Sequence, residues 1–176
     1  MRSWFVLLAA VVAAAGLTAD AVQAGKVEVK GVHLCCGQCV KGVAAALKGV
    51  DGVADAKCDQ KGKTVTFTTK DDKTTTAALK ALTDAGYFGE ASDDGKAVKL
   101  DVASPKAGEK ANDVVVKGVH VCCKQCQDGI NALFKDAKVS YSGSGAQKEV
   151  KVSGKDLEKA KVLETLHKGG FTGKVD

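Results

Sequence analysis

An internal repeat that carries paired cysteines constrains this chain more than any other feature. Residues 27–36 read VEVKGVHLCC and residues 114–123 read VVVKGVHVCC, so eight of ten positions are identical at a shift of 87 residues. The match continues beyond these segments, in Gln38-Cys39 with Gln125-Cys126 and in Gly86-Tyr87 with Gly170-Phe171. A chain that repeats over most of its length is expected to fold as two similar units.

The spacing of apolar residues within each repeat alternates between two residues, typical of strands, and about 3.6 residues, typical of helices. In the first repeat a strand at 27–29 precedes a helix whose apolar face includes Val43 and Leu47. Two alternating segments follow, one of them with Ala54, Ala56 and Cys58 on its core face. A second helix, which Asp71 can cap, then leads to a last strand. The resulting β-α-β-β-α-β order predicts an α+β fold of two tandem ferredoxin-like domains.

The first 24 residues have the features of a secretory signal peptide. Arg2 supplies a positive end, residues 4–15 form an apolar run, and Val22-Gln23-Ala24 ends in small residues suited to cleavage. That run is shorter than the roughly 20 residues that a membrane-spanning helix needs. We therefore expect an exported protein, periplasmic or secreted, without a membrane span after signal removal.

The domain boundaries follow from the repeat and from the position of the single proline. We expect the first domain at 25–102 and the second at 113–176. Residues 103–112 are rich in Ala and Lys and contain Pro105, which is typical of an exposed linker. An alternating segment at 98–102 is either the last strand of the first domain or an extra hairpin arm.

The composition excludes several classes of function. Removal of residues 1–24 leaves the net charge at +5 and removes every Arg, Met and Trp. Without arginine and with few aromatic residues, a nucleic-acid surface is not expected. Without methionine, a Met-rich thioether copper site is excluded. No nucleophile is paired with a base and no motif pairs two carboxylates, so the sequence does not predict an enzyme.

The cysteines that recur in both repeats are the candidate functional residues. Each repeat has a Cys-x-x-Cys, Cys36 to Cys39 and Cys123 to Cys126, between its first strand and first helix. Unpaired N–H groups and the dipole at a helix N-terminus lower thiol pKa values. The resulting thiolates favour soft cations such as Cu(I), Hg(II) or Zn(II). An exposed loop also allows a donor or acceptor protein to exchange the metal.

Both repeats resemble the heavy-metal-associated domain family, the small modules of copper chaperones and periplasmic mercury-binding proteins, in having Cys-x-x-Cys at this place in the fold. The resemblance implies one soft metal ion per domain, held by the two Cys-x-x-Cys pairs. It also implies a protein that buffers or shuttles metal.

The motif departs from the family pattern next to these cysteines. The methionine usual two residues before the first cysteine is replaced by Leu34 and Val121, which are expected to fill the core beneath the loop. The flanking positions add further candidate ligands, namely Cys35, Cys122, His33 and His120. The motif His-x-Cys-Cys-x-x-Cys thus offers two-, three- or four-ligand coordination, including Cys₃ and Cys₃His sites. The identity of the metal stays open.

Two other functions fit the same cysteines. A thiol–disulfide oxidoreductase also places Cys-x-x-Cys at a helix start, although the Trp and cis-Pro context of those enzymes is missing here. In an oxidising compartment the pairs could instead be disulfides of a structural module without metal. Among the remaining residues, Cys58 is expected to pack in the core and His167 to lie on the surface. Tyr87 and Phe171 either shield the metal loop or are ordinary core aromatics.

Overall fold

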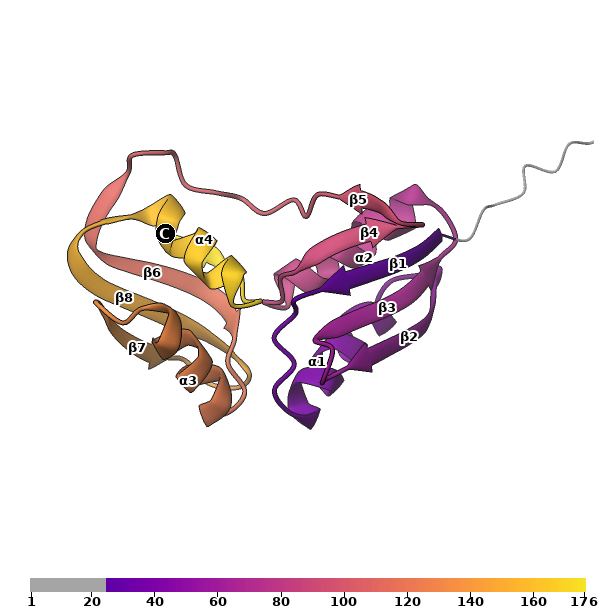
Figure 1. Cartoon of the computed structure of the whole chain (residues 1–176), viewed down its shortest axis with the longest axis horizontal. Helices are drawn as coiled ribbons and strands as arrows, with labels where there is room; N and C mark the ends of the chain where they lie inside the picture. Colours follow the sequence, from indigo (N-terminus) through magenta and orange to yellow (C-terminus); the bar gives the residue numbers. More distant parts are fainter. Residues whose placement is uncertain (1–24) are drawn as a thin grey trace, which may run out of the picture.

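The computed structural model describes residues 25–176, so the predicted signal peptide at 1–24 lies outside the described residues. Within this range helices pack on two separate sheets, which confirms the α+β class. Two halves, 25–98 and 110–176, are joined by residues 99–109, which arch between them along the top of Figure 1. None of the helices in this range is long and apolar enough to cross a membrane.

The first half contains the β-α-β-β-α-β order and one additional strand. Its elements are β1 (Gly25–Lys30), α1 (Gly37–Lys48), β2 (Val53–Asp59), β3 (Thr64–Thr69), α2 (Asp72–Asp84), β4 (Glu90–Asp93) and β5 (Lys96–Val98). They form an antiparallel sheet in the order β2-β3-β1-β4-β5. Because β5 pairs only with β4, the alternating segment near Val98 is an extra hairpin arm beyond the last strand of the repeat.

The second half repeats the order of elements without the additional strand. Its elements are β6 (Lys110–His120), α3 (Lys124–Leu133), β7 (Lys138–Ser142), β8 (Gln147–Glu158), α4 (Lys159–Lys168) and β9 (Lys174–Val175). The sheet order β7-β8-β6-β9 corresponds to β2-β3-β1-β4. Because β6 begins at Lys110, the end of the predicted 103–112 linker belongs to this strand.

The predicted apolar faces form the two cores, with the helices covering one face of each sheet (Figure 1). In the first half the buried set from strands and helices is Val27, Val29, Val43, Leu47, Val65, Phe67, Leu79 and Leu82. Its counterpart in the second half is Val114, Val116, Ile130, Val150, Val152, Leu163 and Leu166. Burying each such side chain stabilises the fold by roughly 1.5–3 kcal/mol. Asp71 caps α2 as predicted, accepting a 2.7 Å hydrogen bond from the Thr74 N–H.

Strand β2 differs from the predicted alternation. Ala54 and Ala56 are exposed and Cys58 is half-buried, so the three side chains do not share a buried face. The pairing of β2 with β3 shifts register between Ala54 and Lys57, and Asp55 between them has a φ of 52°. An irregularity of this kind reverses the facing of side chains along a strand, which alternation in the sequence alone does not reveal.

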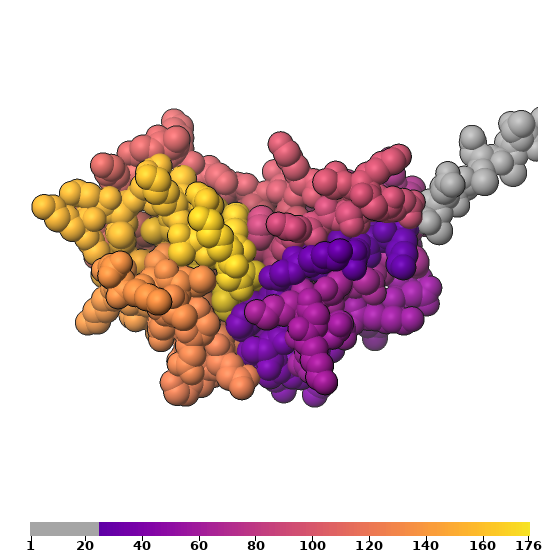
Figure 2. Space-filling model, in the orientation of Figure 1, coloured from indigo at the N-terminus to yellow at the C-terminus, as the bar shows by residue number. Residues whose placement is uncertain are grey.

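The two halves meet through the loops that follow β1, α2, β6 and α4. Figure 2 shows the contact at the centre of the molecule, where yellow residues of the C-terminal segment meet indigo residues that follow β1. The Phe88 N–H donates to the Gly170 carbonyl and the Thr172 N–H donates to the Gly86 carbonyl, each at 3.1 Å. These bonds are equivalents in the repeat, and they flank an isolated antiparallel bridge between Tyr87 and Phe171. The halves are therefore related by an approximate twofold axis.

Candidate metal centre

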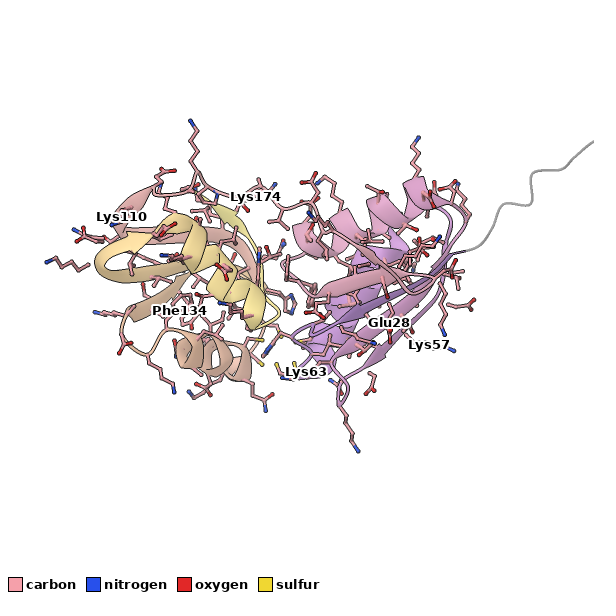
Figure 3. The ribbon with its side chains drawn as sticks, turned by 45° about the horizontal axis from the view of Figure 1, so that its top comes forward. Glu28, Lys57, Lys63, Lys110, Phe134 and Lys174 are labelled. Carbon is pink, nitrogen blue, oxygen red and sulfur yellow. The ribbon has the colours of Figure 1, made fainter. Side chains whose placement is uncertain are left out.

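Six cysteine sulfurs, three from each half, lie together at the junction, where sulfur atoms gather in Figure 3. Cys36 and Cys123 are the N-cap residues of α1 and α3, and both are half-buried. Cys39 and Cys126 lie in the first turns of these helices and are fully buried. The two leading cysteines, as we call the residues directly before each Cys-x-x-Cys, are Cys35 and Cys122. The structure thus brings together both sets of predicted cysteine ligands.

Sulfur contacts join the cysteines within each half and across the junction. Those across the junction are Cys35–Cys123 at 3.6 Å, Cys35–Cys126 at 3.5 Å, Cys36–Cys122 at 3.6 Å and Cys39–Cys122 at 3.7 Å. Those within a half are Cys35–Cys39 at 3.6 Å, Cys36–Cys39 at 3.9 Å, Cys122–Cys126 at 3.7 Å and Cys123–Cys126 at 3.8 Å. Ligands around one tetrahedral ion with metal–sulfur bonds of about 2.3 Å lie about 3.8 Å apart. The sulfurs therefore have the spacing of metal ligands.

The helix starts explain why these thiols can ionise. Cys36 and Cys123 are the N-cap residues, so their sulfurs lie at helix starts, where the first backbone N–H groups have no partner within the helix. The neighbouring Cys126 thiol lowers the pKa of Cys39, and the pKa of Cys126 is raised in return. Of the two buried cysteines, Cys39 is therefore the one that ionises more readily.

The four less buried thiols divide into two kinds. Burial raises the pKa of Cys123, but the nearby backbone N–H of Cys126 and the Cys35 thiol outweigh it, lowering the value to about 7. Burial raises the pKa of both leading cysteines, Cys35 and Cys122. A metal ion that bound here would displace protons from the cluster, because it binds the thiolate form.

His120 lies beside the cluster and is engaged by Tyr87 of the other half. Their rings stack with centroids 4.5 Å apart, and His120 Nε2 lies 3.1 Å from the Tyr87 hydroxyl. The hydroxyl donates its single hydrogen to the Cys39 carbonyl at 2.9 Å. It must therefore accept from His120, which places the imidazole proton on Nε2.

His33 occupies the equivalent position, but it faces Phe171, which has no hydroxyl group. The two rings stack with centroids 4.2 Å apart, and His33 Nε2 is buried without a hydrogen-bond partner among residues 25–176. Ligand atoms of His33, Cys35 and Cys126 all lie within 4.8 Å of one another. Burial lowers the pKa of His33 and so favours the neutral imidazole that binds metals. Of the two predicted histidine ligands, His33 is the one whose Nε2 is buried without a partner among the described residues.

A comparison with protein families finds the same type of domain in the first half. Residues 26–88 match the heavy-metal-associated domain family. The matched segment runs from β1 to the aromatic loop after α2 and includes Cys35, Cys36 and Cys39. The family match supports metal binding, to which the grouping of the cysteine sulfurs also points.

The other comparisons add no functional information. No curated protein matches the chain. Aspartate kinase from Clostridium acetobutylicum is a solved structure with 12% identity and a TM-score of 0.28, aligned over 84% of this chain and 32% of the kinase chain. This chain thus spans about a third of the kinase chain. At that TM-score the likeness supports no conclusion about fold or function.

Several residues near the centre differ from their predicted roles or extend them. Leu34 and Val121 are buried beneath the loops, as predicted. Tyr87 and Phe171 are buried against the histidines of opposite halves, a role that neither predicted alternative included. His167, expected on the surface, is half-buried and stacks on Phe88 of the first half at 3.7 Å. The residue equivalent to Phe88 in the second half is Thr172. The stacked pair of His167 and Phe88 is therefore not repeated, and the sequence repeat does not indicate it.

Proposed function

We propose that this protein is an exported binding protein for a soft metal ion, such as Cu(I), Hg(II) or Zn(II), which it buffers or shuttles. The observation that carries the proposal is the set of four sulfur contacts that cross the junction at 3.5–3.7 Å. On this proposal both halves are ferredoxin-like domains of the heavy-metal-associated type, and their thiolates form one shared cluster. The signal-like features of residues 1–24 support export.

The exposure of the cluster is consistent with metal transfer. Cys36 and Cys123 are half-buried at the ends of their helices, whereas Cys39 and Cys126 are buried behind them. A thiolate of a donor or acceptor protein can therefore approach an ion from the side of the N-cap cysteines. Exchange of ligands one at a time would pass the ion on, and we propose this transfer in place of catalysis.

Mass spectrometry of the intact, non-denatured protein tests this proposal. We expect the reduced protein, kept anaerobic, to retain Cu(I), Hg(II) or Zn(II) in the mass of the folded species. A variant with all four Cys-x-x-Cys residues replaced by serine, C36S/C39S/C123S/C126S, should bind none. Cys58→Ser is the matched control, because Cys58 lies on β2 outside the six-sulfur cluster, and it should bind as the unmodified protein does.

Two results would contradict metal binding. One is the absence of an adduct with any of the three ions after full reduction. This result would favour the alternative that the cysteines form disulfides of a structural module without metal. The other is turnover of a disulfide substrate faster than by a free dithiol, which would favour the oxidoreductase.

A further inference from the structure

We infer that each Cys-x-x-Cys pair holds its own soft ion together with the leading cysteine of the opposite half. The two sets of three sulfurs are Cys36/Cys39/Cys122 and Cys35/Cys123/Cys126. This inference rests on the proposed function and deepens it, because it specifies two three-coordinate sites within the shared cluster. It also gives the additional cysteine of the motif a function, as a ligand to the ion of the opposite half.

Each set forms a nearly equilateral triangle. The edges of the first are 3.9, 3.6 and 3.7 Å, and the edges of the second are 3.6, 3.5 and 3.8 Å. The centre of a triangle with such edges lies about 2.1 Å from each sulfur, close to the ~2.3 Å of a zinc–thiolate bond. A small outward movement of the sulfurs is therefore enough to seat a three-coordinate ion.

The cysteines of a single half form a wider set: the sulfurs of Cys122, Cys123 and Cys126 lie within 4.8 Å of one another, but no sulfur contact as short as those in the two triangles joins Cys122 to Cys123. In the first half, Cys39 contacts both Cys35 and Cys36, but no sulfur contact joins the two adjacent cysteines among the described residues. The backbone explains this arrangement. Cys36 has an extended conformation, with φ −154° and ψ 172°, in which neighbouring side chains diverge, so its sulfur is within 4.8 Å of the Cys35 sulfur but not in contact with it. Cys123 has the same conformation, and both leading cysteines contact sulfurs across the junction.

The two triangles share a cluster but differ in one additional donor. The contacts Cys35–Cys39 and Cys122–Cys126 connect them, at 3.6 and 3.7 Å. His33 lies next to Cys35 and Cys126 of the second triangle, whereas His120 beside the first is engaged by Tyr87. The second triangle thus has His33 as a neighbouring fourth candidate donor.

Two triple variants separate this arrangement from one in which each half binds metal alone. C36S/C39S/C122S leaves Cys35, Cys123 and Cys126, a complete triangle across the junction. C35S/C36S/C39S leaves all three cysteines of the second half. Both variants remove three thiols, including the first Cys-x-x-Cys, so they are matched in composition and differ only in the third cysteine lost.

The probe is Cu(I) under anaerobic conditions, in competition with a chromophoric Cu(I) chelator. We expect C36S/C39S/C122S to bind one Cu(I) as tightly as C36S/C39S does, with three sulfurs per copper by X-ray absorption. We expect C35S/C36S/C39S to bind at least about tenfold more weakly, since even outer-shell partners of a metal are worth about 10- to 100-fold. The unmodified protein should bind at least two Cu(I).

Equal affinities of the two triple variants, or the reverse order, would overturn the inference. One Cu(I) per unmodified protein would also overturn it. The mirror pair, C35S/C123S/C126S and C122S/C123S/C126S, repeats the test if a first-half variant fails to fold, and the second of these should bind more weakly. Failure of the unmodified protein to bind any Cu(I), Hg(II) or Zn(II) would instead refute the proposed function.

Discussion

At the scale of single residues, the two histidines of the repeated motif differ by one oxygen atom in the aromatic ring that covers each. Tyr87 gives His120 a hydrogen-bond partner, whereas Phe171 leaves His33 Nε2 without one. The same hydroxyl also ties α1 to the aromatic loop, since it donates to the Cys39 carbonyl. Tyr87 therefore stabilises the junction and removes one histidine nitrogen from metal binding.

Replacing Tyr87 with phenylalanine should reduce stability without changing the shape of the core. The buried Cys39 carbonyl and the buried His120 Nε2–H would both lose a partner. We expect the free energy of unfolding to fall by about 1–3 kcal/mol, the usual cost of leaving buried polar groups unsatisfied. Urea denaturation of the reduced, metal-free protein measures this difference.

Tyr141→Phe is the matched control for that measurement. Its hydroxyl bonds the Gln127 carbonyl and the Asn131 side chain near the surface, where water can replace the lost hydroxyl. We expect a smaller loss, below about 1 kcal/mol. Equal losses in the two variants would mean that the Tyr87 hydroxyl contributes little to the junction.

The sequence shows which residues can bind metal, but it does not show where their side chains point. Cys-x-x-Cys, the leading cysteines and the histidines are all visible as repeated residues. The sequence does not show that Cys35 and Cys122 point into the opposite half, because that depends on where the second half sits. Nor does it show that Tyr87 and Phe171 cross the junction, since a buried aromatic following a glycine fits an isolated domain equally well.

At the scale of elements, the loops after α2 and α4 set how closely the halves approach. Gly86 has a φ of +87°, and a Cβ there would lie 2.3 Å from the His120 backbone nitrogen and 2.6 Å from the Gly118 carbonyl oxygen. Gly170 meets the backbone of Gly31 and His33 in the equivalent way. Only glycine allows these loops to contact backbone at this distance.

Gly86→Ala should therefore separate the halves as well as strain the loop. Gly95→Ala is the control, because Gly95 also has a positive φ, +78°, but its Cβ would have no neighbour within 4 Å. Both variants should lose about 1–2 kcal/mol from the left-handed backbone. We expect Gly86→Ala to lose more stability and to bind Cu(I) at least about tenfold more weakly, measured by urea denaturation and chelator competition. Similar results for both alanines would show that the loop does not position the halves.

The elements themselves were largely predictable from local signals. Asp71 caps α2, and the buried valines of β1 and β3 follow the predicted alternation of two. The irregularity in β2 was not predictable, because nothing in the residues from Ala54 to Lys57 marks the change of register. A local pattern indicates which residues are apolar, whereas pairing with β3 decides which way each one faces.

At the scale of the whole molecule, metal binding should strengthen the contact between the halves. The junction has backbone bonds from the Phe88 and Thr172 N–H groups together with the stacked rings. Ions bound across the junction add metal–thiolate bonds to these contacts. A ligand that binds only the closed arrangement stabilises it by about 2.7 kcal/mol at a free concentration 100 times its Kd.

Hydrogen exchange of individual backbone amides measures how far bound metal stabilises the contact between the halves. We expect exchange of the Phe88 and Thr172 amides to slow by about 100-fold when saturating Cu(I) is added, following the same stabilisation. The Phe67 amide of β3, inside the first sheet, is the internal reference and should change less. Unchanged exchange at Phe88 and Thr172 would contradict metal binding across the junction.

The repeat predicts two similar units, and it does not predict how they are placed. The side chains at this junction would also fit a separate domain. None of them therefore indicates from the sequence that a second domain packs there. The twofold relation follows from contacts that occur in repeat-equivalent pairs, such as the bonds to the Gly86 and Gly170 carbonyls.

The covalent connection through residues 99–109 has a consequence for how the cluster responds to dilution. A site built from two separate molecules would form in proportion to the square of the protein concentration and would be lost in a dilute compartment. A short tether holds its partner at an effective concentration on the order of millimolar, whatever the abundance of the protein. The chain therefore carries both partners of its own association, and a single copy is sufficient to assemble all six thiols.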